Sequence, residues 1–201
     1  MRILVVGSLT VESGGALLCE RDLPGNQGRL VLALLAVEHR HAVSRDQIAD
    51  ELWPDGLPQS WESALRAVVS KVRAAGVRAG LGQELVGSAF GCYQLPLGDG
   101  TVDVEVAADA LHQAEIELAR GEAGRAASHA LVTCIICRRP FLLGLYNPWT
   151  VALRSRLVDL HVSARQVLAE AHAALGATRS PPRRPGRRST STPTARRSIS
   201  A

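Results

Sequence analysis

The sequence predicts an α+β chain, with short strands and three helices in its first half and helices alone in its second. Three observations support this prediction. Short β-rich runs occupy residues 2–6, 9–12 and 16–19, and turn residues separate them. From residue 26 onward, apolar side chains recur with the spacing of a helix. Between residues 104 and 176, helical spacing is the dominant pattern.

The composition is that of a globular protein and narrows the functional classes. Of the 201 residues, 46% are hydrophobic and 21% are charged, which excludes a collagen, a disulfide scaffold and a wholly disordered chain. No apolar run approaches the roughly 20 residues that a membrane span needs. The first apolar run is also too short for the core of a signal peptide. We therefore expect a cytoplasmic chain without a membrane contact.

The net charge of +4 combines two regions of opposite sign. Residues 177–201 contain seven arginines and no acidic residue, which leaves 16 of the 23 basic residues against 19 acidic ones in the rest of the chain. Any claim of nucleic-acid binding must therefore depend on local clusters of charge. The Arg-, Pro-, Ser- and Thr-rich tail, residues 177–201, is expected to be disordered. Two interpretations of it stay open: a phosphate-binding arm, or an incidental sequence at the end of a shortened reading frame.

The cysteines and histidines give little support for a metal site or an enzyme. Cys134 and Cys137 have CxxC spacing, but a second such pair is missing from the sequence. Two small apolar side chains in a helix are the better explanation for them. The six histidines are scattered, and the sequence has no P-loop, GxGxxG, GxSxG or HExxH motif. We expect no catalytic residue, no metal and no cofactor.

Two helices are expected before residue 54. Residues 26–39 form the first, with Leu30, Leu34 and Val37 on its apolar stripe. Ser44 and Gln47 have the three-residue separation of a capping box, which predicts that the second helix begins after Ser44. The turn residues that start at Pro54 end it.

The helix that follows Ser60 is the most informative segment of the chain. At about 100° per residue, one of its faces is apolar and consists of Trp61, Leu65, Val68, Val69 and Val72. The opposite face is small and nearly flat and consists of Ser63, Ala67, Ser70 and Ala74. Arg66 and Arg73 flank this small face on one side, and Lys71 flanks it on the other.

A flat face between cations suits a helix that enters the major groove of DNA. Small side chains allow close approach to the base edges, and the cations contact guanines or phosphates. The other interpretation is a solvated face on an ordinary helix. Residues 85–95 favour the first, because they predict two strands around a glycine-bounded turn. A small antiparallel sheet upstream, helices and a hairpin make a winged helix-turn-helix, in which the hairpin, or wing, contacts the DNA backbone.

The second half is expected to be an all-α, TPR-like domain over residues 103–176. A Gly- and Asp-containing linker separates it from a winged-helix domain over residues 1–97. Helices are expected over residues 107–120 and 122–137, with Gly121 at the turn between them, and a long third helix begins at Asn147 and Pro148. Helical hairpins stacked in this way form an interaction surface for a partner.

Several motifs occur together in the order found in one family. They are GRLVLALL at residues 28–35, VSRDQIADELW at 43–53, SALRAVVSKVR at 63–73 and YQL at 93–95, followed by RRPFLLGLYNPW at 138–149. This combination resembles the Streptomyces antibiotic regulatory protein (SARP) family, which pairs an OmpR-type winged helix with a bacterial transcriptional activation domain. The resemblance covers about residues 1–176, with the activation domain shortened at its C-terminus.

The resemblance implies an activator of secondary-metabolite, or antibiotic, biosynthesis genes in the nucleoid. Such proteins bind direct repeats in double-stranded DNA near the promoter, with a homodimer on the DNA as one arrangement, and recruit RNA polymerase through contacts that include the sigma factor. The implied DNA contacts are Ser63, Arg66, Ser70, Lys71 and Arg73 on the third helix, Ser44 and Arg45 at the start of the second, and Ser88 in the wing. The alternative is a helical protein–protein adaptor whose winged helix no longer binds DNA.

Overall fold

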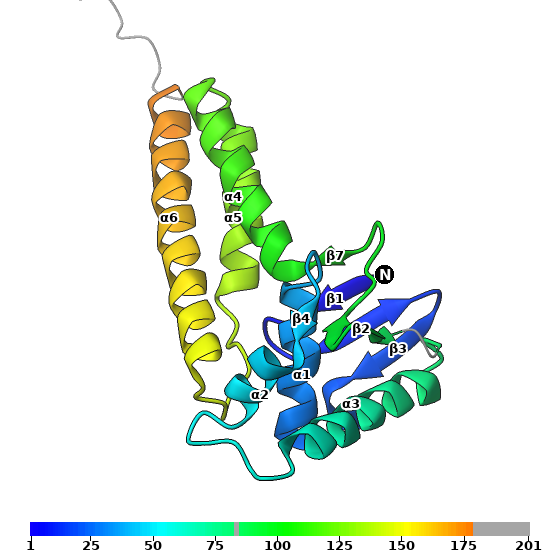
Figure 1. The fold of residues 1–201 in the computed structure, drawn as a ribbon. Coiled ribbons are helices and arrows are strands. Elements are labelled where there is room, and N and C mark those ends of the chain that lie inside the picture. The colour runs from blue at the N-terminus through cyan, green and yellow to red at the C-terminus, as the bar shows by residue number, and fades with distance from the viewer. Residues whose placement is uncertain (83–84, 179–201) are drawn as a thin grey trace, which may run out of the picture.

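The computed structural model describes residues 1–82 and 85–178 and places an N-terminal sheet at the centre of the first half (Figure 1). The order of its strands is β3-β2-β1-β7. They are β1 (Arg2–Leu4), β2 (Thr10–Ser13), β3 (Ala16–Cys19) and β7 (Thr101–Val102). The first three pair antiparallel as predicted, whereas β7 pairs parallel to β1. The segment expected to be a linker thus contributes an edge strand.

Three helices pack beside this sheet: α1 (Gly25–Val37), α2 (Arg45–Leu52) and α3 (Trp61–Arg78), with a short 3-10 turn, η1 (Glu20–Asp22), before them. The capping box at the start of α2 is confirmed. Ser44 Oγ accepts from the backbone N–H of Gln47 at 3.1 Å, and Gln47 Oε1 accepts from the N–H of Ser44 at 3.0 Å. Such a cap stabilises a helix by about 1 kcal/mol.

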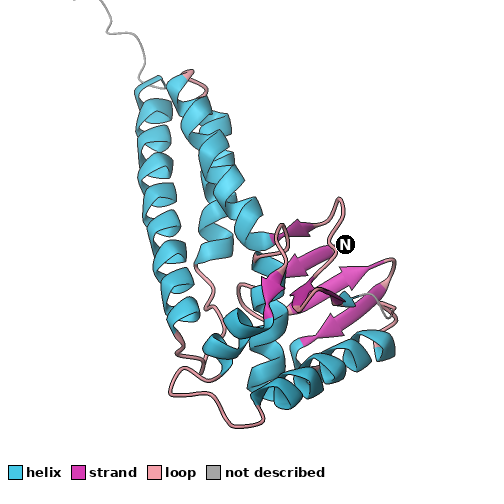
Figure 2. Cartoon of the chain, viewed as in Figure 1, coloured by secondary structure: helices cyan, strands magenta, loops and turns pink. Residues whose placement is uncertain are grey.

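A second small sheet contains the predicted hairpin. Its strands are β4 (Val43–Ser44), β5 (Gly87–Ala89) and β6 (Cys92–Gln94), in the order β4-β6-β5 and all antiparallel (Figure 2). Because β4 runs directly into α2, pairing with β6 fixes the start of that helix against the hairpin. The winged-helix arrangement predicted for the first half is therefore present.

The second half consists of α4 (Asp103–Ala119), α5 (Ala123–Cys137) and α6 (Pro148–Thr178), which pack side by side (Figure 1). Gly121 joins the first two with a φ of +80°, in the left-handed region that favours glycine. Ala126 and Ala130 of α5 are buried. The hydroxyl of Thr133, also in α5, donates to the backbone carbonyl of Ala107 in α4 at 2.8 Å.

No helix within residues 1–82 and 85–178 has both the length and the apolarity to cross a bilayer. The tail that was predicted to be disordered lies, from residue 179 on, outside the described residues.

One hydrophobic core joins the two halves. It contains Ile3, Val31 and Leu65 from the first half together with Phe141 and Leu153 from the second.

Polar contacts add to this junction. The buried carboxylate of Asp103 accepts from the backbone N–H groups of Val5 at 2.9 Å and Val6 at 3.1 Å, and Gly7 N–H donates to Pro140 O at 2.7 Å. The helical half is thus held in place by the sheet of the winged-helix half.

Candidate nucleic-acid interface

The two faces of α3 have the exposure that the sequence predicts. Its apolar face packs on the core, and Leu65, Val68, Val69 and Val72 are buried. The small face is exposed along its whole length at Ser63, Ala67, Ser70 and Ala74. In Figure 1, α3 lies along an edge of the molecule away from the bundle of α4, α5 and α6. No described part of the chain covers the small face, so a duplex has access to it.

The small face is long enough to follow several base pairs. From Ser63 to Ala74 a helix rises about 16 Å at roughly 1.5 Å per residue. The bases of one DNA strand follow one another at about 3.4 Å, so this length matches four to five base pairs. Ser63 donates its hydroxyl to Ser60 O at 2.9 Å, which leaves its oxygen free to accept a hydrogen bond.

Two of the predicted cations on α3 are exposed. Arg66 and Lys71 lie on opposite sides of the small face, and neither has a hydrogen-bond or ion-pair partner in the described part of the chain. Glu62 is the only acidic residue of α3. Arg66 and Lys71 therefore keep their charges available for an anionic partner.

Tyr93 holds two other predicted cations, Arg73 and Arg45, at the edge of the wing. The guanidinium carbons of Arg45 and Arg73 lie 5.8 and 5.9 Å from the centroid of its ring, within the range of a cation–π contact. Arg73 Nε also donates to Val86 O at 2.8 Å. Tyr93 is buried, and nothing in the sequence beyond the YQL motif signals this positioning role.

The start of α2 lies against the same hairpin. The backbone N–H of Arg45 donates to Gly91 O at 3.1 Å, and Ser44 caps the helix as described above. Arg45 Nε is buried without a hydrogen-bond partner in the described chain, and an unsatisfied donor of this kind costs about 1–3 kcal/mol.

The wing has an unusual tip. Ser88 on β5 is exposed, as a backbone contact requires. Beyond it, Phe90 is fully exposed at 105% and has a φ of +49°, followed by Gly91 with a φ of +78°. Positive φ at both central residues is the geometry of a type I′ hairpin turn, in which Asn-Gly is usual and a bulky residue is rare. No prediction from the sequence concerned Phe90, although its place before Gly91 between two expected strands is a signal of the turn.

The structure thus brings Arg45, Arg73 and Ser88 together around the hairpin. Ser63, Arg66, Ser70 and Lys71 lie along α3, and Ser44 lies at the start of α2.

The CxxC pair, Cys134 and Cys137, lies near the end of α5, and Cys137 is buried. No group of three His, Cys, Asp or Glu side chains is placed to hold a metal ion in residues 1–82 and 85–178. Burial, together with the smaller effects of the nearby Cys134 and Asp103, raises the pKa of the Cys137 thiol to about 11. Because the thiolate is the form that binds metals, this environment opposes coordination.

The fold is similar to that of EmbR from Mycobacterium tuberculosis, in a structure of EmbR in complex with a low-affinity phosphopeptide. The TM-score is 0.74 at 22% sequence identity. The match covers 87% of this chain and 46% of the EmbR chain, so this chain spans about half the length of that one. No protein-family model and no curated protein matches the sequence. The likeness confirms the predicted fold class, a winged helix followed by a TPR-like helical part.

Proposed function

We propose that the chain is a sequence-specific DNA-binding transcriptional regulator of the SARP type. Its α3 enters the major groove, and the β5–β6 hairpin lies on the adjacent backbone. The observation that carries this proposal is the exposed small face of α3, with Arg66 and Lys71 on its two sides and without partners among residues 1–82 and 85–178. A solvated face on an ordinary helix also explains the exposure, but it does not explain why Tyr93 holds two arginines, Arg45 and Arg73, at the wing beside α3.

The proposed roles follow from position. Arg66 and Ser70 contact base edges, because Ser70 lies on the small face and Arg66 borders it near its middle. Lys71 contacts a phosphate on the other side of the groove. Ser44, Arg45 and Ser88 contact the backbone next to the wing, and Arg73 supports the wing through Val86 O while its outer nitrogens face the duplex.

The finer proposal is an activator of secondary-metabolite genes in the nucleoid. Two copies on direct repeats near a promoter would recruit RNA polymerase, including the sigma factor, through the helical half. The motifs at residues 28–35, 43–53, 63–73 and 138–149 support this proposal. The helical half has a partner-binding type of architecture, since α4, α5 and α6 stack as TPR-like helices.

Arg66→Ala tests the recognition role. On a duplex selected by the protein, we expect a loss of about 1–3 kcal/mol in specific affinity, because a guanine contact is lost. Affinity for a scrambled duplex changes little. Arg156→Ala, which removes an exposed cation of α6, is the matched control and is expected to leave both affinities unchanged.

Two results would contradict these assignments. Equal weakening on both duplexes, with a salt slope reduced by about one, makes Arg66 a phosphate contact. Absence of any salt-dependent binding to DNA by the unmodified chain would favour the adaptor instead, because phosphate neutralisation always produces a salt dependence.

A further inference from the structure

The ring of Phe90, at the tip of the wing, makes no contact that holds the fold together. It is fully exposed, and within the described part of the chain it lies against no other ring and no cation. Cys92 Sγ reaches only the backbone carbonyl of Phe90, at 3.8 Å. The left-handed backbone at this position suits Asn or Gly better than an aromatic residue. The ring is therefore free to contact a partner outside the chain.

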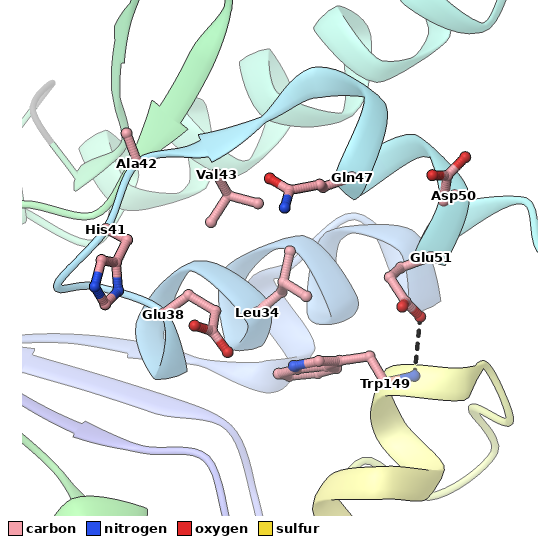
Figure 3. A pocket seen from close by; sticks show the side chains of 9 residues that line it. All are labelled: Leu34, Glu38, His41, Ala42, Val43, Gln47, Asp50, Glu51 and Trp149. Carbon is pink, nitrogen blue, oxygen red and sulfur yellow. Dashed lines mark hydrogen bonds between the residues drawn. The ribbon is translucent and has the colours of Figure 1, made fainter.

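Two other features of the surface are explained by contacts within the chain. Tyr146 is also exposed, but the guanidinium carbon of Arg154 lies 5.2 Å from the centroid of its ring. A pocket of about 490 Å³ lies between α2 and α6, and Glu51 in its wall accepts from Asn147 Nδ2 at 2.6 Å and from the backbone N–H of Trp149 at 3.0 Å. Figure 3 shows the second of these bonds as a dashed line. Because both bonds connect α2 to the first turn of α6, the pocket belongs to the junction between the two halves.

The hairpin presents the ring of Phe90 on a narrow and rigid support. Ala89 pairs with Cys92, so Phe90 and Gly91 alone form the turn. On its other side β6 pairs with β4, which ties the hairpin to the start of α2. The side chains of Ser88, Ala89 and Cys92 are small. The minor groove of B-DNA is about 6 Å wide and about 7.5 Å deep, so a tip with one bulky side chain can bring that side chain to the bases.

The surroundings of the tip favour DNA over an apolar protein surface as the partner. The backbone N–H of Arg45 donates to Gly91 O at 3.1 Å, and the guanidinium groups of Arg45 and Arg73 lie against Tyr93 in the hairpin. Residues 85–95 contain no acidic side chain that would repel phosphates. A hairpin that lies on the phosphates next to α3 borders the adjacent minor groove, because a single backbone separates the two grooves.

We propose that Phe90 inserts between two neighbouring base pairs from the minor groove, unstacks them and bends the duplex. Phe90 can act in this way only if α3 and the wing bind DNA, so the inference rests on the proposed function. Apolar side chains inserted in this manner kink DNA by about 20–90° toward the major groove. The pyrimidine–purine steps TA and CA/TG unstack most easily. The wing therefore selects such a step next to the bases that α3 contacts.

The test uses a duplex selected by the unmodified chain, with 2-aminopurine in place of one adenine at a time. The fluorescence of 2-aminopurine rises when the base loses its stacking. The unmodified chain should raise this fluorescence by about twofold or more at one step beside the α3 site. FRET between dyes at the two ends of the duplex measures the bend.

Phe90→Ala should lose the rise in fluorescence and the bend. It should also bind the selected duplex about tenfold more weakly, because the stacking of an aromatic ring on a base is lost. Phe90→Leu should keep part of both signals, since leucine side chains also insert between base steps. Neither variant removes buried surface, because the ring is fully exposed, so both should fold.

Two comparisons make the test specific. Tyr146→Ala removes an exposed aromatic ring outside the wing and is the matched control, which should bind and bend the duplex as the unmodified chain does. Replacement of the flexible step by AA, within a stiff A-tract, should weaken binding of the unmodified chain about fivefold. The same replacement should hardly change the binding of Phe90→Ala, which does not unstack the step.

The proposal is overturned if the unmodified chain binds the selected duplex without a rise in fluorescence at any step, or if Phe90→Ala keeps both signals. Either result leaves recognition by α3 intact, because specific binding is measured on the same duplex. Unchanged affinity of Phe90→Ala would leave the ring to a protein partner and would also overturn the proposal. If the unmodified chain selects no duplex, the proposed function itself is wrong, and the role of Phe90 in DNA binding is wrong with it.

Discussion

Phe90→Asn at the tip of the wing separates the stability of the chain from its contact with DNA. The left-handed conformation at Phe90, with a φ of +49°, costs an ordinary L residue about 1–2 kcal/mol. Asn tolerates this conformation far better. The ring is 105% exposed, so its removal gives up no buried surface. We expect the free energy of unfolding to rise by about 1 kcal/mol, which raises Tm by about 2–4 °C for a chain of this size.

The same variant should bind DNA more weakly, because exposed apolar side chains of this kind pack on sugars or between base steps in the minor groove. Phe90→Ala is the matched control. It removes the ring but keeps the strained backbone, so it should lose DNA affinity without gaining stability. Thermal unfolding and a DNA titration measure the two effects. A lower Tm for Phe90→Asn would refute the strain argument, and an unchanged affinity would refute the contact with DNA.

Three further predictions concern Asp103 and the cysteines. Asp103→Asn should lower the free energy of unfolding in urea by about 1–3 kcal/mol. The reason is that the amide nitrogen of Asn cannot accept a hydrogen bond, so one of the two bonds from Val5 N–H and Val6 N–H is lost. An unchanged free energy would contradict this role of Asp103. Burial raises the pKa of Asp103 above its ordinary 3.8, although hydrogen bonds from Val5 and Val6 and the charge of Arg139 act against this shift. The folded state therefore keeps a proton that the unfolded chain has lost, and stability from this group falls as the pH rises above 3.8. The difference in Tm between the unmodified chain and Asp103→Asn should therefore shrink as the pH rises above 3.8. A difference in Tm that grows with pH would contradict the raised pKa of Asp103. Finally, Cys137 should react with iodoacetamide about tenfold more slowly than the partly exposed Cys92, because Cys137 is buried and its pKa is raised to about 11. Peptide mapping measures both rates, and equal rates would show that Cys137 is accessible.

Features that depend on local sequence were predictable. The capping box of Ser44 and Gln47 needs only two residues three positions apart, and it is present with both of its hydrogen bonds. The apolar and small faces of α3 follow from helical periodicity alone, and their burial agrees with it. Local signals suffice here because hydrogen bonding and side-chain direction within a helix repeat over a few residues.

Features that depend on contacts between distant segments were not predictable. The two-residue strand β7 pairs with β1 from the far end of the first half, and a strand this short has no periodicity to detect. The positions of Arg45 and Arg73 against the ring of Tyr93 require the hairpin and both helices to be folded. The pocket between α2 and α6 likewise exists only after Glu51 meets Asn147 and Trp149. Each of these depends on tertiary structure, which no short window of sequence encodes.

Recognition of DNA by the small face of α3, as proposed, can be measured by selecting bound duplexes from a random pool. The unmodified chain, Ala67→Glu and Ala169→Glu are compared, since both alanines are exposed in the middle of a helix and only Ala67 lies on α3. We expect the unmodified chain and Ala169→Glu to enrich one shared motif, and Ala67→Glu to enrich none, because its carboxylate faces the bases and phosphates. Enrichment of the same motif by Ala67→Glu, or of no motif by the unmodified chain, would contradict the claim.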